Sequence, residues 1–309
     1  MPRSLVLGVN GQDGSYVAEA LLRRGHEVIG IGRGGASRYV GSSPNFSYAD
    51  LDLRDNDALA GFVAEVRPDF AFHFAAVHGA AGFHYEPVVA DMLAVNVTAL
   101  HVLLEHARRE APGMRIIYAG SSKIFPAPLA GVIDELTPAR ATCLYSIGKL
   151  TSRDLISFYR SQHGIAATNL ILFNHESARR PARFFLPTIA RGIAETLSNP
   201  RHSFRVHTLD FWIDWSAAED IAELAVEIAE RSDEGEFVLA SGIVRHARLA
   251  VSELFAKYGL DAERHVLTSL ERSDPGPSFS VSLARLERAI GRRPAKSLQD
   301  IVADMIASV

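Results

Sequence analysis

The sequence contains a single cysteine, Cys143, among its 309 residues. An internal disulfide framework and a cysteine-based zinc site are therefore excluded. The twelve histidines show no metal-ligand spacing, so no metal site is expected. The sequence also has no large excess of positive or negative charge, since its formal net charge is −4. This balance gives no electrostatic case for binding nucleic acid.

Long hydrophobic runs are missing as well. We find no apolar stretch approaching the ~20 residues needed to span a bilayer, and no signal peptide precedes the first apolar run. No internal repeat, low-complexity segment or linker is present. The hydrophobic content of 48% and charged content of 22% are ordinary for a soluble globular protein. We therefore expect a cytoplasmic protein without nucleic-acid or membrane partners.

What is present is organised around residues 4–33, which have the pattern of a strand, a turn, a helix and a second strand. Residues 5–7 form a short apolar run, and apolar residues then recur at helical spacing until Gly25. The turn between them has the pattern G-x-x-G-x-x-G, formed by Gly8, Gly11 and Gly14. The segment therefore predicts a βαβ unit with glycines at its first turn.

A glycine is needed at each of the three positions for a different physical reason. Gly8 permits a tight turn out of the strand, and Gly11 lets a pyrophosphate approach the backbone because it has no Cβ. Gly14 lets the helix pack close to the strand. Exposed N–H groups and the positive end of the helix dipole favour phosphate at this place. The sequence therefore predicts a dinucleotide-binding turn rather than an ordinary glycine turn.

The residues at the end of the second strand indicate whether the dinucleotide is NAD or NADP. Enzymes that prefer NAD usually place an acid there, whereas an arginine accommodates the 2′-phosphate of NADP. This chain has Arg33 and, further along the loop, Arg38. We therefore favour NADP(H), the alternative being that both arginines are only solvated loop charges.

Strands alternate with helices as far as residue 120. The expected strands are 46–55, 70–74 and 115–119, and the alternation predicts an α/β fold with a doubly wound, mostly parallel Rossmann sheet. Ligands of such sheets lie beyond the carboxyl ends of the strands. Small residues follow one of those ends, Ala75 and Ala76, and suggest close approach by a ligand.

The regular alternation breaks down after residue 173. We expect a loop over 124–144, a helix from Tyr145 through Arg160, and a strand over 166–173. Residues 1–173, joined by about 216–245, should form an NADP-binding Rossmann domain. Residues 174–215 and 246–309 should form a smaller, interleaved α+β lobe that binds the substrate.

A second motif, Y-x-x-x-K, places Tyr145 and Lys149 on one helical face. A lysine ammonium there is expected to lower the pKa of the tyrosine towards neutrality. Such a tyrosine exchanges a proton with a sugar oxygen while a hydride moves to or from a nicotinamide. Ser121, after the strand 115–119, is positioned to bond the same oxygen.

With these motifs, the chain resembles the extended short-chain dehydrogenase/reductase superfamily, in its nucleotide-sugar-modifying branch, over nearly its whole length. Within that branch it is most similar to the GDP-mannose 4,6-dehydratase family. The closer likeness rests on GVNGQDGSYVAE at 8–19, LFNHESARRP at 172–181, DWSAAEDIAEL at 214–224 and FVLASG at 237–242.

The resemblance implies a role for individual positions. The catalytic core would be Ser121, Tyr145 and Lys149. The cofactor would be held by these last two residues together with Gly8, Gly11, Gln12, Asp13, Gly14, Arg33, Asp52, Leu53, Ala75 and Ala76, with Asp52 and Leu53 beside the adenine. The substrate would be contacted by Ser122, Asn174, Arg183 and Arg272. Relatives also pair through helices equivalent to 92–109 and 145–160, which implies a homodimer.

One departure from the family changes the expected chemistry. The dehydratases carry an acid two residues after the strand-end hydroxyl residue, and this acid removes the C5 proton during loss of water. The corresponding residue here is Lys123, which reverses the local charge. Ile213 also replaces the arginine that the dehydratases tend to have before Asp-Trp, which affects the nucleotide contacts.

We therefore interpret the chain as an NADPH-dependent reductase of a nucleotide-linked 4-keto(-6-deoxy) sugar, with GDP as the expected nucleotide. The alternative is a 4,6-dehydratase or epimerase with a relocated base, for which Lys123, Glu135, His78 and His84 are candidates. A further alternative is a non-catalytic NADP-binding protein, which would not need the Tyr145–Lys149 pair.

Overall fold

The computed structural model describes residues 1–80 and 82–308. Within them, seven strands form a sheet in the order β11-β7-β5-β4-β1-β2-β3, and every neighbouring pair is parallel. The strands are β1 (Arg3–Leu7), β2 (Glu27–Gly32), β3 (Phe46–Asp50), β4 (Phe70–His73), β5 (Arg115–Ala119), β7 (Ala167–Leu172) and β11 (Glu236–Leu239). The strand order reverses between β1 and β4, so the predicted doubly wound Rossmann sheet is confirmed.

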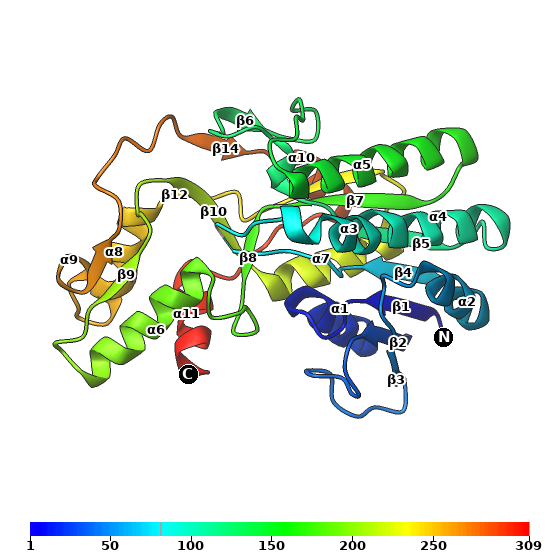
Figure 1. Cartoon of the computed structure of the whole chain (residues 1–309), viewed down its shortest axis with the longest axis horizontal. Coiled ribbons are helices and arrows are strands. Elements are labelled where there is room, and N and C mark those ends of the chain that lie inside the picture. Colours follow the sequence, from blue (N-terminus) through cyan, green and yellow to red (C-terminus); the bar gives the residue numbers. More distant parts are fainter. Residues whose placement is uncertain (81, 309) are drawn as a thin grey trace.

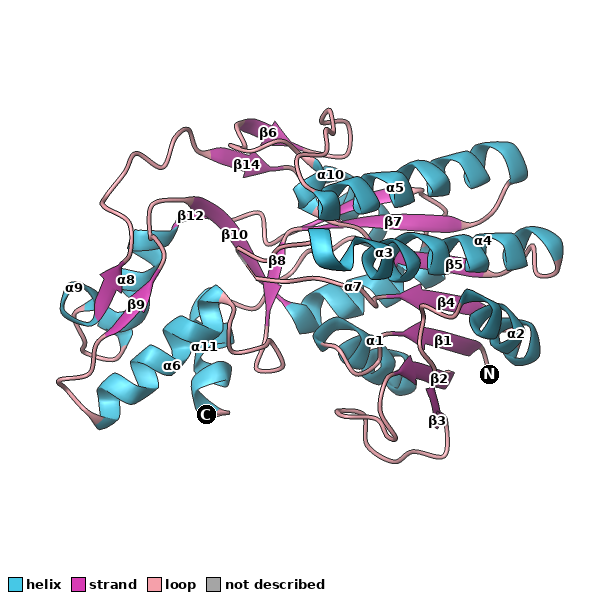
Figure 2. Ribbon diagram, viewed as in Figure 1, coloured by secondary structure: helices cyan, strands magenta, loops and turns pink. Residues whose placement is uncertain are grey.

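Helices cover both faces of this sheet (Figure 2). One face is covered by α1 (Gln12–Arg23), α7 (Ala218–Arg231) and α10 (Ala284–Ile290), whose apolar residues share one buried cluster with the strands. The other face is covered by α2 (Asn56–Val66), α4 (Ala99–Arg109) and α5 (Leu144–His163). The mostly apolar strands are thus buried on both sides, as parallel sheets require.

The segment before α4 is helical without interruption. It comprises η1 (Glu86–Val88), α3 (Val89–Leu93) and a π-helical turn, η2 (Ala94–Thr98). The stretch Glu86–Arg109 is long and apolar enough to cross a membrane by length and composition. The expectation that no segment reaches that size was therefore wrong. Leu100, Leu103 and Leu104 of this stretch are fully buried against the sheet, as in a core helix.

A smaller group of elements lies beside the sheet, at the left of Figure 1. Its strands are β8 (Asn174–Glu176), β10 (Trp212–Ala217) and β12 (Val244–His246) in one sheet, and β9 (Phe204–Val206) with β13 (Val266–Thr268) in another. Its helices are α6 (Phe185–Ser198), α8 (Ala247–Lys257), α9 (Ala262–His265) and α11 (Leu298–Ala307). These elements have their own apolar core, and β8 leads directly from β7 into it. The assignment of this group to substrate binding stays a prediction.

The expected loop over 124–144 contains structure that its sequence did not reveal. It begins in the short helix η3 (Ser122–Ile124) and includes β6 (Gly131–Ile133), which pairs in parallel with β14 (Phe279–Val281). Val132 points outward and is largely exposed, so β6 has no apolar alternation of useful length. Its partner lies far along the chain, and only the folded structure brings the two strands together.

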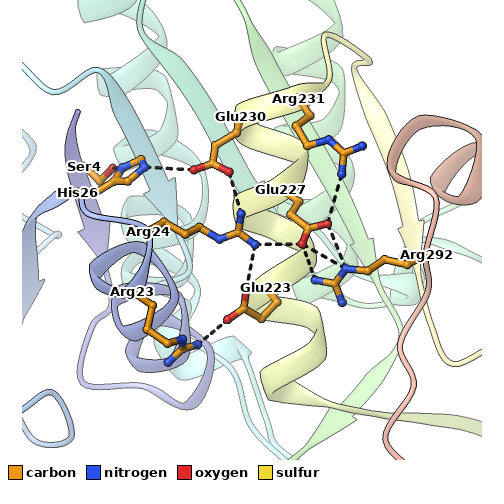
Figure 3. Close-up of polar contacts among 9 residues, drawn as sticks. All are labelled: Ser4, Arg23, Arg24, His26, Glu223, Glu227, Glu230, Arg231 and Arg292. Atoms are coloured by element: carbon orange, nitrogen blue, oxygen red, sulfur yellow. Dashed lines mark hydrogen bonds and ion pairs between the residues drawn. The ribbon is translucent and has the colours of Figure 1, made fainter. Parts of the chain in front are cut away.

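A network of charged side chains ties α1 to α7 (Figure 3). Glu227 of α7 lies 2.9 Å from Arg24 and 2.7 Å from Arg292, and its side chain is only 12% exposed. Glu230 continues the network to His26. Hydrogen bonds from Arg292, the largest cause, and from Arg24 hold the pKa of Glu227 below its ordinary value against the effect of burial.

We predict that Glu227→Gln lowers the free energy of unfolding by about 1–2 kcal/mol at neutral pH, because it removes the charge that Arg24, Arg231 and Arg292 share. The loss should shrink in acid, since the lowered pKa of Glu227 stabilises the fold only while its carboxylate is ionised. Urea unfolding measures it. Glu253→Gln, in an exposed pair with Arg245, is the control, and an equal loss in both variants would contradict the prediction.

Candidate active site

The glycine turn lies where β1 and β4 separate. Gly8 has φ +91°, and a Cβ there would lie 2.6 Å from the backbone nitrogen of Ala75 at the end of β4. A Cβ on Gly14 would overlap the carbonyl oxygen of Gly8, and one on Gly11 would lie 3.2 Å from that oxygen. The turn, the start of α1 and the end of β4 are therefore in close contact, which a side chain at Gly8 or Gly14 would prevent.

The N-terminus of α1 is open to an anion. Its N-cap is Gly11, and no side chain bonds the first N–H groups of the helix. Those N–H groups and the helix dipole therefore remain available for a phosphate group. The backbone here fits the pyrophosphate of a dinucleotide, which stands as the predicted occupant.

Gln12 and Asp13 begin the same helix but face the second group of elements. Gln12 donates to the backbone carbonyl of His175, and the Asp13 carboxylate lies 3.0 Å from the His175 ring. Burial would raise the pKa of Asp13, but the charge of His175 and its hydrogen bonds outweigh burial and lower this pKa to about 2. Burial alone would lower the pKa of His175, but the charge of Asp13 and its hydrogen bond outweigh burial, so this pKa is raised. The pair holds the glycine turn against β8.

His175 was missed when site residues were assigned from the sequence, although it lies inside the F-N-H-E-S motif. Only its place in that motif could have identified His175 from the sequence, because no sequence pattern indicates that it contacts Asp13. The two segments of closest family likeness, 8–19 and 172–181, meet through this buried ion pair.

The expected adenine side lies at the ends of β2 and β3. Arg33 follows β2 and is exposed, whereas Leu53 is buried. Asp52 accepts hydrogen bonds from Arg54, which are the main cause of its low pKa of about 2. Asp52 is thus held by a neighbouring side chain, a contact that the sequence reading did not include. Ala76 is exposed at the end of β4 beside Ala75.

The catalytic candidates come together from two elements. Ser121 follows β5 and is 9% exposed, and Tyr145 and Lys149 lie in the first turns of α5. The Ser121 hydroxyl is close enough to Tyr145 to lower the pKa of the phenol by hydrogen bonding. The Lys149 ammonium lies 5.6 Å from the Tyr145 ring centroid. The strand end and the helical Y-x-x-x-K motif therefore share one site.

The electrostatics of this site differ from the expectation. Burial raises the pKa of Tyr145 well above its ordinary value, and Lys149 is not among the groups that oppose this. The Lys149 ammonium instead donates to the Ala119 carbonyl at 2.6 Å and to the Tyr118 hydroxyl at 3.1 Å. The prediction that Lys149 lowers the pKa of Tyr145 was therefore wrong for this structure. At neutral pH Tyr145 is therefore a protonated phenol and not a phenolate.

The groups proposed as replacement bases are placed very differently. Lys123 is exposed, so the burial that would make it a base is missing. Glu135 accepts a hydrogen bond from the Val238 backbone and lies near Arg285, on the β11 side of the fold. His84 is exposed at the surface beside Glu86. Of these four groups, only His78 lies against Tyr145, with the two ring centroids 4.9 Å apart.

The predicted substrate residues are scattered around this centre. Ser122 is half-buried in η3, and Asn174 begins β8 with an exposed side chain. Arg183 is exposed beside Phe184, and Arg272 lies in an exposed loop near Asp210. Within the described residues, no hydrogen bond or ion pair joins Arg183 or Arg272 to the Tyr145 centre. Their contact with substrate stays a prediction.

Together, the doubly wound sheet, the glycine turn and the Ser121–Tyr145–Lys149 group define a short-chain dehydrogenase/reductase of the extended, nucleotide-sugar type. A sequence model of the family described as GDP-mannose 4,6 dehydratase matches residues 5–292. The chain belongs to the GDP-mannose 4,6-dehydratase family.

Similar proteins support this assignment. A GDP-mannose 4,6-dehydratase of Vibrio cholerae serotype O1 is 30% identical over 350 residues, covering 99% of this chain and 92% of that protein. The human GDP-mannose 4,6 dehydratase is 29% identical over 269 residues, covering 83% of this chain and 72% of that protein.

Solved structures share the fold at lower identity. A dTDP-glucose 4,6-dehydratase from Bacillus anthracis in complex with NAD has a TM-score of 0.83 at 13% identity, covering 100% of this chain and 96% of that one. RMD from Pseudomonas aeruginosa, complexed with NADPH, has a TM-score of 0.77 at 18% identity, covering 100% of this chain and 99% of that one.

We predict that Lys149 makes the stability of the protein depend on pH. Burial lowers its pKa to about 7, from 10.5 for the free side chain. The unfolded chain therefore binds more protons between these values, and stability should rise from about pH 7 to about pH 10. Lys149→Met should remove this part of the rise, measured by urea unfolding across the pH range. Lys257→Met on α8 is the control, and parallel curves for wild type and Lys149→Met would contradict the prediction.

Proposed function

We propose that this protein is an NADPH-dependent reductase of a nucleotide-linked 4-keto sugar, with a GDP-linked 4-keto-6-deoxyhexose as the expected substrate. The observation that carries the proposal is the composition of the site. Ser121, Tyr145 and Lys149 are together, whereas the dehydratase acid is replaced by the exposed Lys123. A hydroxyl, a tyrosine and a lysine without that acid are what reduction of a ketone requires.

When bound, NADPH supplies the hydride that is added to C4 of the sugar. Tyr145 donates its phenolic proton to the C4 oxygen, and its raised pKa keeps that proton in place at neutral pH. Ser121 holds the same oxygen by a hydrogen bond. Lys149 would act as a positioning residue, because its bonds to the Ala119 carbonyl and the Tyr118 hydroxyl fix the start of α5, and with it Tyr145, against the end of β5.

The cofactor would be held by the glycine turn, with Arg33 on the 2′-phosphate. The exposed position of Arg33 after β2 supports this choice. The nucleotide of the substrate would lie between the sheet and the smaller group of elements, near Asn174. A homodimer through α4 and α5 and a cytoplasmic location are part of the same proposal.

A second candidate function is a 4,6-dehydratase or epimerase with a relocated base. The relatives named above are dehydratases, and the ring contact of His78 with Tyr145 gives this candidate a specific group. NADPH consumption distinguishes this candidate from the reductase, because neither dehydration nor epimerisation consumes NADPH.

The activity test uses two reactions. Purified protein is incubated with GDP-mannose plus NADP⁺, and separately with GDP-4-keto-6-deoxymannose plus NADPH. We expect NADPH consumption and a gain of two hydrogens in the second reaction only. Tyr145→Phe, which keeps the ring but removes the proton donor, should lower that rate by about 100-fold or more. Loss of water in the first reaction would contradict the proposal.

Cofactor choice is tested at Arg33. Arg33→Ala should weaken NADPH binding by about 10-fold to 100-fold, because a charge-assisted contact to the 2′-phosphate is lost, and should leave NADH binding unchanged. Titration of nicotinamide fluorescence measures both. Arg201→Ala, at the exposed turn after α6, is the control. Equal effects of Arg33→Ala on NADPH and NADH would exclude the 2′-phosphate role.

A further inference from the structure

Four rings, one of them that of Tyr145, pack together, and they come from three separate segments. His78 and Tyr85 lie in the connection after β4, Tyr145 begins α5, and Phe184 precedes α6. The His78 ring lies 4.9 Å from Tyr145 and 5.8 Å from Phe184, and Tyr85 lies 5.6 Å from Tyr145, all between ring centroids. An imidazole is thus built into the wall of the site beside the proton donor.

The imidazole is held at one nitrogen by Tyr85. The Tyr85 hydroxyl lies 3.2 Å from Nδ1 of His78 and accepts a hydrogen bond from the Gly79 backbone at 3.1 Å. The oxygen of Tyr85 has a second lone pair, so it can also accept the proton of Nδ1. In that arrangement the lone pair of His78 is on Nε2. The bond at one ring nitrogen therefore determines what the other can do.

The backbone next to His78 is fixed from the other side. Asn96, in the π-helical turn η2, accepts a hydrogen bond from the Val77 backbone at 2.9 Å. The Asn96 carbonyl in turn accepts hydrogen bonds from Tyr118 and Ser152. Because Tyr118 is also bonded to Lys149, His78 is positioned by the same buried framework as the catalytic core.

The His78 ring carries no charge in this site. Burial, together with the positive charges of Arg180 and Lys149, lowers its pKa to about 3, so the ring is neutral. Within the described residues Nε2 makes no hydrogen bond. What places His78 in the site is geometry: its ring contacts Tyr145, and with Nδ1 turned to Tyr85 the lone pair on Nε2 can take up a proton.

We propose that His78 is a second acid–base group of this site, which removes the hydrogen from a carbon next to the C4 carbonyl of the bound sugar. The inference rests on the proposed function, since it assumes a 4-keto sugar held by Ser121 and Tyr145. It adds a substrate requirement, namely a hydrogen on C3 or C5. Neither Lys123 nor Glu135 is placed to do this, for the reasons given above.

The step is balanced without an oxidant or a reductant. Nε2 of His78 takes the proton, and the C–H electron pair becomes the C=C bond of an enol. The carbonyl π electrons take the Tyr145 proton, so that oxygen becomes the enol hydroxyl. The reverse step returns a proton to the carbon. Since a proton on His78 exchanges with solvent, the carbon hydrogen is replaced by one from water.

The test measures this exchange directly. Enzyme, GDP-4-keto-6-deoxymannose and NADP⁺ are incubated in D₂O, and deuterium in the sugar is followed by mass spectrometry against an enzyme-free control. Reduction with NADPH is measured separately. We expect exchange with wild type, and a loss of about 100-fold in His78→Gln. The ratio of exchange to reduction should fall at least about 10-fold in that variant. Tyr85→Phe, which keeps the ring, should slow exchange by about 10-fold.

A matched control is His84→Gln, since His84 is an exposed histidine of the same connection, and it should leave both rates unchanged. Exchange that persists in His78→Gln, or wild-type reduction without exchange, would overturn the role of His78 while leaving the proposed reductase standing. Exchange without any NADPH consumption would support His78 and overturn the reductase. If wild type shows neither exchange nor reduction, both proposals fail.

Discussion

The structure depends on how closely α1 approaches the turn after β1. Gly14 faces the carbonyl of Gly8, and Gly8 itself lies against Ala75 at the end of β4. This contact brings an uncapped helix N-terminus to the point where the strand order reverses. The Asp13–His175 ion pair then joins the same helix to β8, and the network around Glu227 joins its other end to α7. The glycine turn is therefore held in position from both ends of one helix.

The candidate catalytic groups are arranged around a buried lysine, Lys149. Lys149 is almost fully enclosed and is stabilised by the Ala119 carbonyl and the Tyr118 hydroxyl. Its position at the end of β5 places positive charge near Tyr145 without a direct bond to the phenol. Burial keeps Tyr145 protonated and keeps His78 neutral. The site therefore combines the proposed proton donor with a neutral imidazole, and Lys123, at the position where the resemblance implies an acid, is exposed.

Sequence patterns predicted the parts of this arrangement that are local. The glycine spacing gave the first turn, the i and i+4 spacing put Tyr145 and Lys149 on one helical face, and alternating strands and helices gave the sheet. Contacts between distant segments could not be read in this way. Nothing in the sequence aligned β6 with β14, Asp13 with His175, or His78 with Phe184. Nor could spacing show that Lys149 bonds Tyr118, because that depends on how α5 packs on β5.

Hydride transfer to C4 is followed directly with NADPH that carries deuterium on the transferable position of the nicotinamide. The protein is given GDP-4-keto-6-deoxymannose, and the sugar product is analysed by mass spectrometry and NMR. The account predicts one deuterium at C4 of the product for each NADPH consumed. A product without deuterium, or deuterium at another carbon, would contradict hydride delivery to a carbonyl held by Ser121 and Tyr145.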